Sequence, residues 1–289
     1  MRRRYARRAR TMLPGIAVWF FVVTMASGIA KAHGPLHDQI ASLSLRIEKE
    51  PGNAVLFLRR GELYRLHGSA DEARADFERA ARIDPALHEV HLGLAQLWLD
   101  EGRPDPALSE VAACLGRAPG EARALFIRAQ ALVALGRVGE AVGVMDRAIA
   151  HTTEPRPEHY LERARLIARA RPMTDQALDR AVRGLDQGIA RLGPAVTLSW
   201  FAVELETAGG RYDRALERLD EIDPQCARKE TLLGRRGEIL EAAGRWMEAQ
   251  AAYTEALDAI AALPARVRYT RSIIELETSL RAKLKSTAP

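Results

Sequence analysis

The sequence contains few cysteines and few long apolar runs, and each shortage excludes a class of protein. Only 2 of its 289 residues are Cys. Two thiols cannot support a disulfide-stapled small fold or a zinc site of four thiolates. A single apolar run, near the N-terminus, is long enough to cross a bilayer, so a bundle of membrane-spanning helices is excluded. With 47% hydrophobic residues, the chain buries a large core and is not disordered.

The excess of basic side chains is confined to the N-terminal segment, residues 1–32. The chain has 43 Lys and Arg, 38 Asp and Glu, and a formal net charge of +5. Residues 1–32 hold seven of the basic residues and no acidic one, which leaves 36 basic against 38 acidic residues, a charge of −2, in 33–289. Nucleic-acid binding needs a basic surface on the folded part of a protein. We therefore expect no nucleic-acid partner.

This N-terminal segment has the three parts of a secretory signal peptide. Residues 1–10 carry six Arg, residues 12–29 are apolar, and Ala30-Lys31-Ala32 matches the A-x-A pattern at which such leaders are cleaved. The sequence therefore predicts export, with the rest of the chain in the periplasm or secreted. Only five of the basic residues are Lys, which suggests a GC-rich bacterial genome. The alternative is an uncleaved membrane anchor, since about 18 apolar residues just span a bilayer.

Glycine, alanine and proline recur along the chain at a constant spacing of about 34 residues, and such self-similarity is the sequence signature of a repeat protein. The positions concerned are Gly68, Gly102 and Gly136, Gly210 and Gly244, Ala73, Ala107 and Ala141, Ala215 and Ala249, and Pro85 and Pro119. Between residues 136 and 210 the spacing slips by six residues from two full periods. We expect one structural unit per period.

The first period, residues 54–87, has the pattern of two short helices. In the first helix the spacing i, i+4 and i+7 places on one face Phe57, Gly61 and Tyr64. In the second helix the same spacing gives Ala73, Phe77 and Ala80. Gly68 separates the two, because a residue that tolerates positive φ suits the end of a helix. Pro85 stops the second helix, since proline cannot continue it.

The motif Phe57-x2-Arg60-Gly61-x2-Tyr64 … Ala73-x3-Phe77 … Ala80 … Pro85 resembles a tetratricopeptide repeat, a helix–turn–helix unit of about 34 residues. It departs from the family pattern at Arg60, where the family usually has Leu. The resemblance implies an all-α fold, a TPR-like α-solenoid of antiparallel helix pairs. About six units can be drawn, at 54–87, 88–121, 122–155, 157–195, 196–226 and 230–263. Residues 171–175 lengthen the turn of the fourth.

Two further helices are expected at the ends of the repeat domain 54–263. Terminal repeats of a solenoid expose a stacking face that needs a cover. Residues 33–53 place Ile40, Leu43 and Ile47 on one stripe, which predicts an N-terminal capping helix. In 264–289 we expect a C-terminal capping helix that begins at Pro264. Its inward residues would be Ile273, Ile274, Leu276, Leu280 and Leu284.

The resemblance also implies a concave face formed by the first helix of each unit, and it assigns set positions of each unit to that face. These positions form an apolar line with polar edges, which suits an extended peptide or a helix, so we expect a protein or peptide partner. The residues are Leu58, Leu92, Phe126, Leu161 and Trp200 in the apolar line and Arg59, Glu62, Gln96, Gln130, Arg165 and Glu204 at the edges. The alternative is that the apolar residues pack against the neighbouring repeat.

Some activities are not expected. The catalytic patterns H-E-x-x-H, G-x-S-x-G and G-x-G-x-x-G and the phosphate-binding loop do not occur in the sequence. We therefore expect a protein that is not an enzyme and holds no cofactor. Leu58 and Glu62 stand where chaperone-binding members of the family carry Lys and Asn, so the grip of those members on a chain-terminal carboxylate is not expected.

An alternative function, metal handling, rests on two histidines near the predicted cleavage site. Cleavage after Ala32 would make His33 the N-terminal residue, and a free α-amine with its own imidazole can chelate Cu(II). His37, four residues later, or His67 would supply a further ligand. The simpler interpretation is a polar segment before the first helix.

Overall fold

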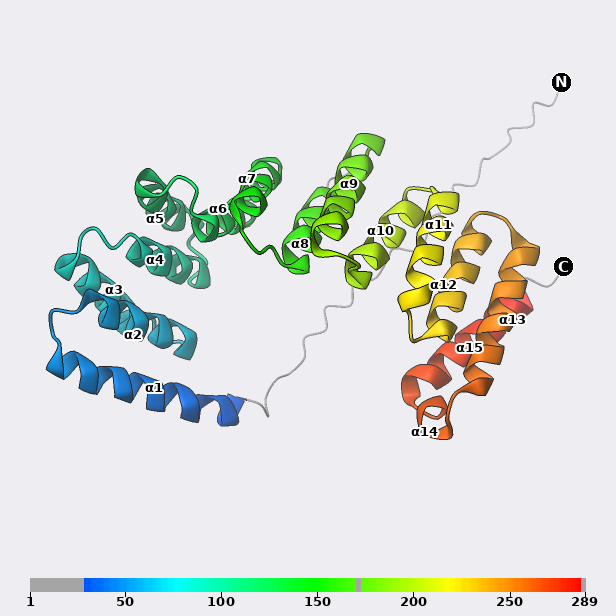
Figure 1. Ribbon diagram of the computed structural model, residues 1–289, viewed down its shortest axis with the longest axis horizontal. Helices are drawn as coiled ribbons and strands as arrows, with labels where there is room; N and C mark the ends of the chain where they lie inside the picture. Colours follow the sequence, from blue (N-terminus) through cyan, green and yellow to red (C-terminus); the bar gives the residue numbers. More distant parts are fainter. Residues whose placement is uncertain (1–28, 170–172, 287–289) are drawn as a thin grey trace, which may run out of the picture.

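The computed structural model describes residues 29–169 and 173–286. Over these residues fifteen α-helices and one short 3₁₀ helix follow one another without a strand, and they stack into an open arch (Figure 1). The predicted leader lies outside the described residues except for its last four, which belong to α1 (Ile29–Lys49). No helix in this part of the chain combines the length and the apolar character needed to span a membrane. The predicted all-α solenoid is confirmed.

Six antiparallel helix pairs make up the arch. In Figure 1 the first helix of each pair lies on the inner side of the arch and the second on the outer side. The pairs are α2 (Ala54–His67) with α3 (Ala70–Ile83), α4 (Glu89–Asp100) with α5 (Pro104–Arg117), α6 (Ala122–Ala134) with α7 (Val138–His151), α8 (Pro157–Ala168) with α9 (Asp175–Leu192), α10 (Val196–Ala208) with α11 (Tyr212–Ile222), and α12 (Lys229–Ala242) with α13 (Trp246–Ala262). The 3₁₀ helix η1 (Asp223–Gln225) precedes α12, and α14 (Ala265–Arg268) and α15 (Arg271–Ser286) end the arch.

A left-handed glycine ends the first helix in five of the six pairs. The φ angles of Gly68, Gly102, Gly136, Gly210 and Gly244 lie between 71° and 87°, where residues with a Cβ are strained. The N–H after each glycine returns to a carbonyl of the helix, as Ser69 N–H does to Tyr64 at 2.9 Å, which satisfies the helix end. In the fourth pair the connection between α8 and α9, for which the sequence predicts a longer turn, includes residues 170–172, which lie outside the described residues. These glycines therefore recur along the sequence because a turn of this kind recurs in the helix pairs.

Aromatic side chains of the outer helices occupy the space that glycines on the inner helices leave. Phe77 on α3 is fully buried. A Cβ on Gly61 of α2 would lie 2.8 Å from its ring, and one on Gly93 of α4 would lie 2.7 Å from it. Carbon atoms do not pack that closely. The first two helix pairs can therefore meet at this distance only because both positions are glycine.

Arg60, the residue that departs from the family pattern, forms an ion pair that joins three helices. Its Nε and Nη2 donate to the carboxylate oxygens of Asp76 on α3 at 2.7 and 2.8 Å, and its Nη1 donates to Ser44 Oγ on α1 at 3.0 Å. The Asp76 side chain is buried. Its hydrogen bond raises the pKa of the Arg60 guanidinium although burial opposes the shift. Arg60 thus attaches the N-terminal capping helix to the first pair.

The two ends of the arch are covered by α1 and α15. On α1, Ile40 and Ile47 are buried and Leu43 packs against the core. The prediction of one C-terminal helix from Pro264 is wrong, because the chain turns between α14 and α15. The inward residues of α15 are Ile273, Leu276, Leu280 and Leu284. Ile274 falls beside this stripe and is 48% exposed, so its predicted inward position is also wrong.

We predict that Gly61→Ala lowers the free energy of unfolding by about 1–3 kcal/mol, because the added methyl group must displace the Phe77 ring. Gly143→Ala is the matched control. Gly143 also lies inside a helix, but nothing stands within 4 Å of its Cβ position. This control should gain about 0.5–1 kcal/mol. Urea titrations followed by circular dichroism measure both, and similar effects of the two substitutions would contradict the described packing.

We predict that Arg60→Leu, which restores the residue usual in the family, lowers the free energy of unfolding by about 3 kcal/mol, because it leaves the Asp76 carboxylate buried without its partner. The double variant Arg60→Leu/Asp76→Leu removes both charges and should recover most of that loss. The same titrations compare the two. A single variant as stable as the double variant would show that the ion pair has no such role.

Candidate protein-binding groove

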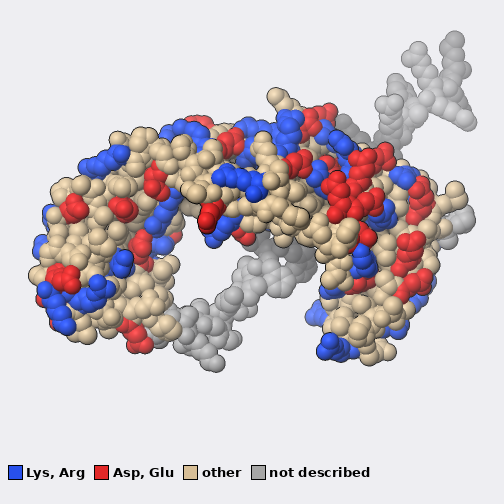
Figure 2. Space-filling view, in the orientation of Figure 1, with Lys and Arg blue, Asp and Glu red and all other residues tan. Residues whose placement is uncertain are grey.

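The inner helices of the arch surround an open hollow, and basic and acidic side chains are mixed along its edge (Figure 2). Three smaller depressions open on the inner helices. The first lies between α1 and α2 and includes Asp38, Arg59, Glu62 and Leu66. The second lies between α6 and α8 and includes Phe126, Gln130, Val133, Glu162, Arg165 and Arg169. The third lies between α10, α12 and α15 and includes Trp200, Glu204, Arg235, Glu238 and Lys283.

Seven of the eleven predicted groove residues line these depressions. They are Arg59 and Glu62 in the first, Phe126, Gln130 and Arg165 in the second, and Trp200 and Glu204 in the third. Leu58 and Leu92 are buried in the core, as the alternative interpretation of the apolar line has it. Leu161 packs against the core cluster, and Gln96 donates a hydrogen bond to Asp100 at 3.2 Å.

The depression between α6 and α8, here called the α6–α8 pocket, arises from a change in the stacking of the pairs. Inner helices of neighbouring pairs pack on each other at α2–α4, α4–α6 and α8–α10, whereas α6 and α8, like α10 and α12, make little contact. Residues 152–156, which lead into α8, are extended at both ends rather than turned. Arg191 of α9 holds this connection by donating hydrogen bonds to the carbonyls of Ile149, Thr152 and Thr153 at 3.2, 2.6 and 3.3 Å.

The α6–α8 pocket is lined by both apolar and charged residues. Its volume is about 370 Å³, and its apolar lining includes Phe126, Val133, Met145 and Leu166. The ring of His159 lies against that of Phe126, with centroids 4.3 Å apart. Burial, followed by the nearby Arg156, lowers the pKa of His159, which favours the neutral imidazole. The guanidinium of Arg165 lies 5.6 Å from the centre of the Phe201 ring.

The positions assigned from the first unit missed part of this pocket. Arg169 lies one helical turn after Arg165, and the i, i+4 spacing on α8 could have identified it. Met145 lies on an outer helix, and Leu166 is a core residue of α8, so neither belongs to the positions that a regular repeat turns inward. Both reach the pocket because α6 and α8 are separated.

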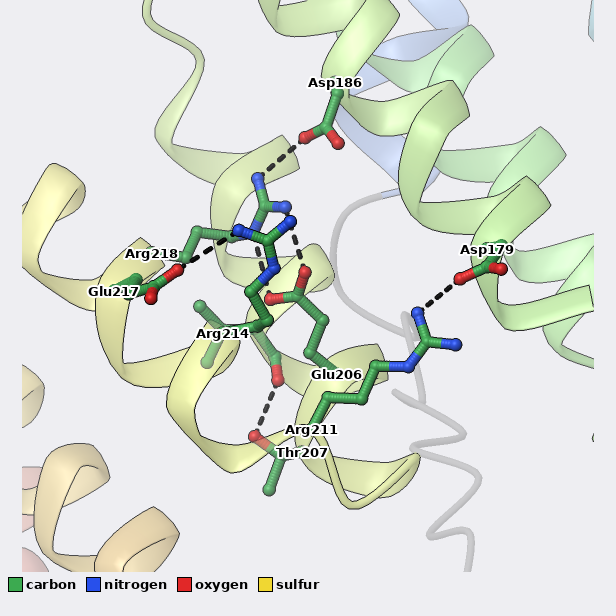
Figure 3. Close-up of polar contacts among 9 residues, drawn as sticks. Asp179, Asp186, Glu206, Thr207, Arg211, Arg214, Glu217 and Arg218 are labelled. Atoms are coloured by element: carbon green, nitrogen blue, oxygen red, sulfur yellow. Dashed lines mark hydrogen bonds and ion pairs between the residues drawn. The ribbon is translucent and has the colours of Figure 1, made fainter. Parts of the chain in front are cut away.

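An ion-pair network fixes the helices on the far side of α8 (Figure 3). Arg218 of α11 donates to both carboxylate oxygens of Glu206 on α10 at 3.1 and 3.0 Å and to Asp186 on α9 at 2.7 Å. Glu206 is only 4% exposed. Burial alone would lower the pKa of Arg218, but the bonds to Glu206 and Asp186 outweigh it and raise the pKa. Arg211 also pairs with Asp179, so the fourth and fifth helix pairs form one rigid support.

Of the three histidines considered for metal binding, the structure describes the side chains of His37 and His67. The side chain of His33 lies outside the described residues. His37 on α1 contacts His67 at the end of α2, with ring centroids 4.6 Å apart and the rings nearly perpendicular. The Nδ1 of His67 lies 3.0 Å from Ser69 Oγ. Among the described residues no three His, Cys, Asp or Glu side chains come together as a metal site would require.

Stacked antiparallel helix pairs with a concave face of mixed polarity define the class of helical-repeat proteins. Models of the tetratricopeptide repeat match residues 54–87 and 89–157, and a model described as a tetratricopeptide repeat-like domain matches residues 158–277. Together these matches cover most of the sequence. The chain belongs to the tetratricopeptide repeat family, whose repeats support a role as a protein-interaction scaffold.

Several solved structures are similar to this chain at low sequence identity. A tetratricopeptide repeat protein from Parabacteroides merdae is 21% identical, over 89% of this chain and 96% of its own, with a TM-score of 0.48. PilF of Pseudomonas aeruginosa is 15% identical, over 80% and 97%, with a TM-score of 0.51. PilW, a type IV pilus biogenesis factor, is 19% identical, over 68% and 89%, with a TM-score of 0.53. The likeness to PilF and PilW, whose TM-scores exceed 0.5, shows the fold alone at these identities. A search of curated proteins found no match.

Proposed function

We propose that this protein is an exported scaffold that captures a segment of another protein along its concave face and catalyses no reaction. The observation that carries the proposal is the α6–α8 pocket, where half-buried Phe126 and Val133 lie on the inner side of the arch beside the exposed Gln130 and Arg165. A protein surface that places an apolar depression among polar residues suits the side chain of a bound segment.

The groove would extend from this pocket toward the C-terminal end of the arch. Trp200 is half-buried on α10 and lines the third depression together with Glu204. Leu276 and Leu280 of α15 reach the same depression and approach Gly234 of α12. The capping helix therefore covers part of the inner face of the last pair. The uncovered length available to a partner is centred on α6, α8 and α10.

The proposed place of action, outside the inner membrane, rests on the sequence of residues 1–32. We predict that N-terminal sequencing of the protein purified from its host gives His33 as the first residue, since Ala30-Lys31-Ala32 matches a cleavage pattern. Fractionation of the same cells should place the protein in the periplasm or the medium. An intact Met1 in the membrane fraction would support the anchor, and an intact Met1 in the cytosol would contradict export.

We predict that a photo-crosslinking amino acid at position 130 captures a partner in living cells, and that Phe126→Glu or Trp200→Glu reduces the crosslink at least about tenfold, because a charge cannot be desolvated in the groove. The matched control is Met247→Glu, an apolar-to-acidic change at a residue that is 86% exposed at the start of the outer helix α13. Circular dichroism confirms that each variant is folded. A crosslink from position 130 that remains in both groove variants would contradict the proposal. So would a partner that is captured from position 147 of the outer helix α7 and not from position 130.

A further inference from the structure

The α6–α8 pocket differs in charge from the other two depressions of the inner helices. Its lining includes two arginines, Arg165 and Arg169, and one acidic residue, Glu162. The depression between α1 and α2 has one basic and two acidic residues, and the one between α10, α12 and α15 has two of each. The pocket is therefore the one of these three with a net positive charge.

Within the described residues the two arginines have no carboxylate partner, a property they share with Arg59, whereas three other arginines of the inner helices are paired. Arg65 pairs with Asp100, Arg123 with Glu62, and Arg235 with Glu238. Within the described part of the chain neither Arg165 nor Arg169 has a carboxylate within 4.0 Å, and Glu162 bonds to neither. Like charges one helical turn apart repel each other. An anion held between the two guanidiniums would remove that repulsion and complete their hydrogen bonding.

From this arrangement we infer that the bound segment is acidic at this point: a bulky apolar side chain enters the α6–α8 pocket, and an Asp or Glu next to it pairs with Arg165 and Arg169. This inference rests on the proposed function and specifies its partner. Both arginines line the pocket that the apolar side chain enters, and they are one turn of helix apart, a rise of about 5.4 Å. An extended chain advances about 3.3 Å per residue. The acidic residue therefore stands within about two residues of the apolar one.

The anion is an internal side chain rather than the end of a chain. Helices α6 and α8, which line the pocket, lie in the middle of the arch, with the inner helices α2 and α4 on one side and α10 and α12 on the other (Figure 1). A segment seated here can continue along the inner face in both directions. The guanidinium carbon of Arg165 lies over the Phe201 ring, 5.6 Å from its centre, and a cation–π contact of this kind does not use the N–H donors that a carboxylate would bind.

Selection from displayed peptide libraries tests this inference. The full chain is immobilised and screened against random peptides embedded between linkers, and separately against random peptides that end in a free carboxylate. The embedded library should yield peptides with Asp or Glu within about two residues of Phe, Leu, Ile, Met or Trp. On the variant Arg165→Glu/Arg169→Glu the selected charge should change from acidic to basic. Arg147→Glu, at an exposed arginine of the outer helix α7, is the control and should select the same peptides as the native protein.

A selected peptide then serves as the probe in a double-mutant cycle. Replacing its Glu with Gln should weaken binding to the native protein about tenfold, the loss of one charge-assisted carboxylate pair. The same replacement should have little effect on the variant Arg165→Gln/Arg169→Gln, because the partners of the carboxylate are already removed. Equal losses in the native protein and the variant would overturn the assignment of the two arginines.

The outcomes separate this inference from the proposed function. Peptides that bind the native protein, lose binding with Phe126→Glu and show no acidic preference would leave the groove standing and overturn the acidic partner. Enrichment only in the library of peptides that end in a free carboxylate would also overturn the internal acidic residue and leave the groove standing. Enrichment of basic peptides would do the same. If no selected peptide depends on Phe126, both the groove and the acidic partner are wrong.

Discussion

The arch depends on how closely its helices approach one another. A pair of helices of about a dozen residues each buries too little apolar surface to be stable alone. In this chain the approach is made possible at residues such as Gly61 and Gly93, against which the ring of Phe77 packs without an intervening Cβ. Each pair thereby covers the apolar side of the next, and the inner helices acquire a common face. The concave surface is a consequence of this packing.

The irregular fourth pair turns a regular solenoid into one with a distinct pocket. The extended connection before α8, held by Arg191, separates α8 from α6. On the other side, Arg218 fixes α9, α10 and α11 to one another. The hydrogen bonds of Arg191 on one side of α8 and the ion pairs of Arg218 on the other therefore both support the separation of α8 from α6. A buried network of this kind costs desolvation, and its benefit is a defined relative placement of the helices.

Much of the fold could be predicted from the sequence because its determinants are local. The glycines of the turns recur with the period of the repeat since each must adopt a left-handed conformation, and the helix pairs follow from them. The family pattern also predicts inner-face positions for Phe126, Gln130 and Arg165, and these three residues line one pocket. The same rule assigned Leu58 and Leu92 to the groove, although the close packing of α2 and α4 buries them.

The remainder could not be predicted because it depends on departures from the period. Arg60 breaks the family pattern, and only the structure shows that Asp76 and Ser44 complete its bonding. The break between α14 and α15 divides the C-terminal helix that the sequence predicts. Met145 reaches the α6–α8 pocket through the gap between two helices, which no pattern within a single unit records. Such features arise between units, where a periodic rule carries no information.

The most direct measurement of the central claim is a crystal structure of the protein with a segment of its natural partner bound. The account predicts that the segment runs along the inner helices and places one bulky apolar side chain between α6 and α8. A segment bound to the outer helices, or at the exposed Trp246 and Met247, with the inner face empty, would contradict it.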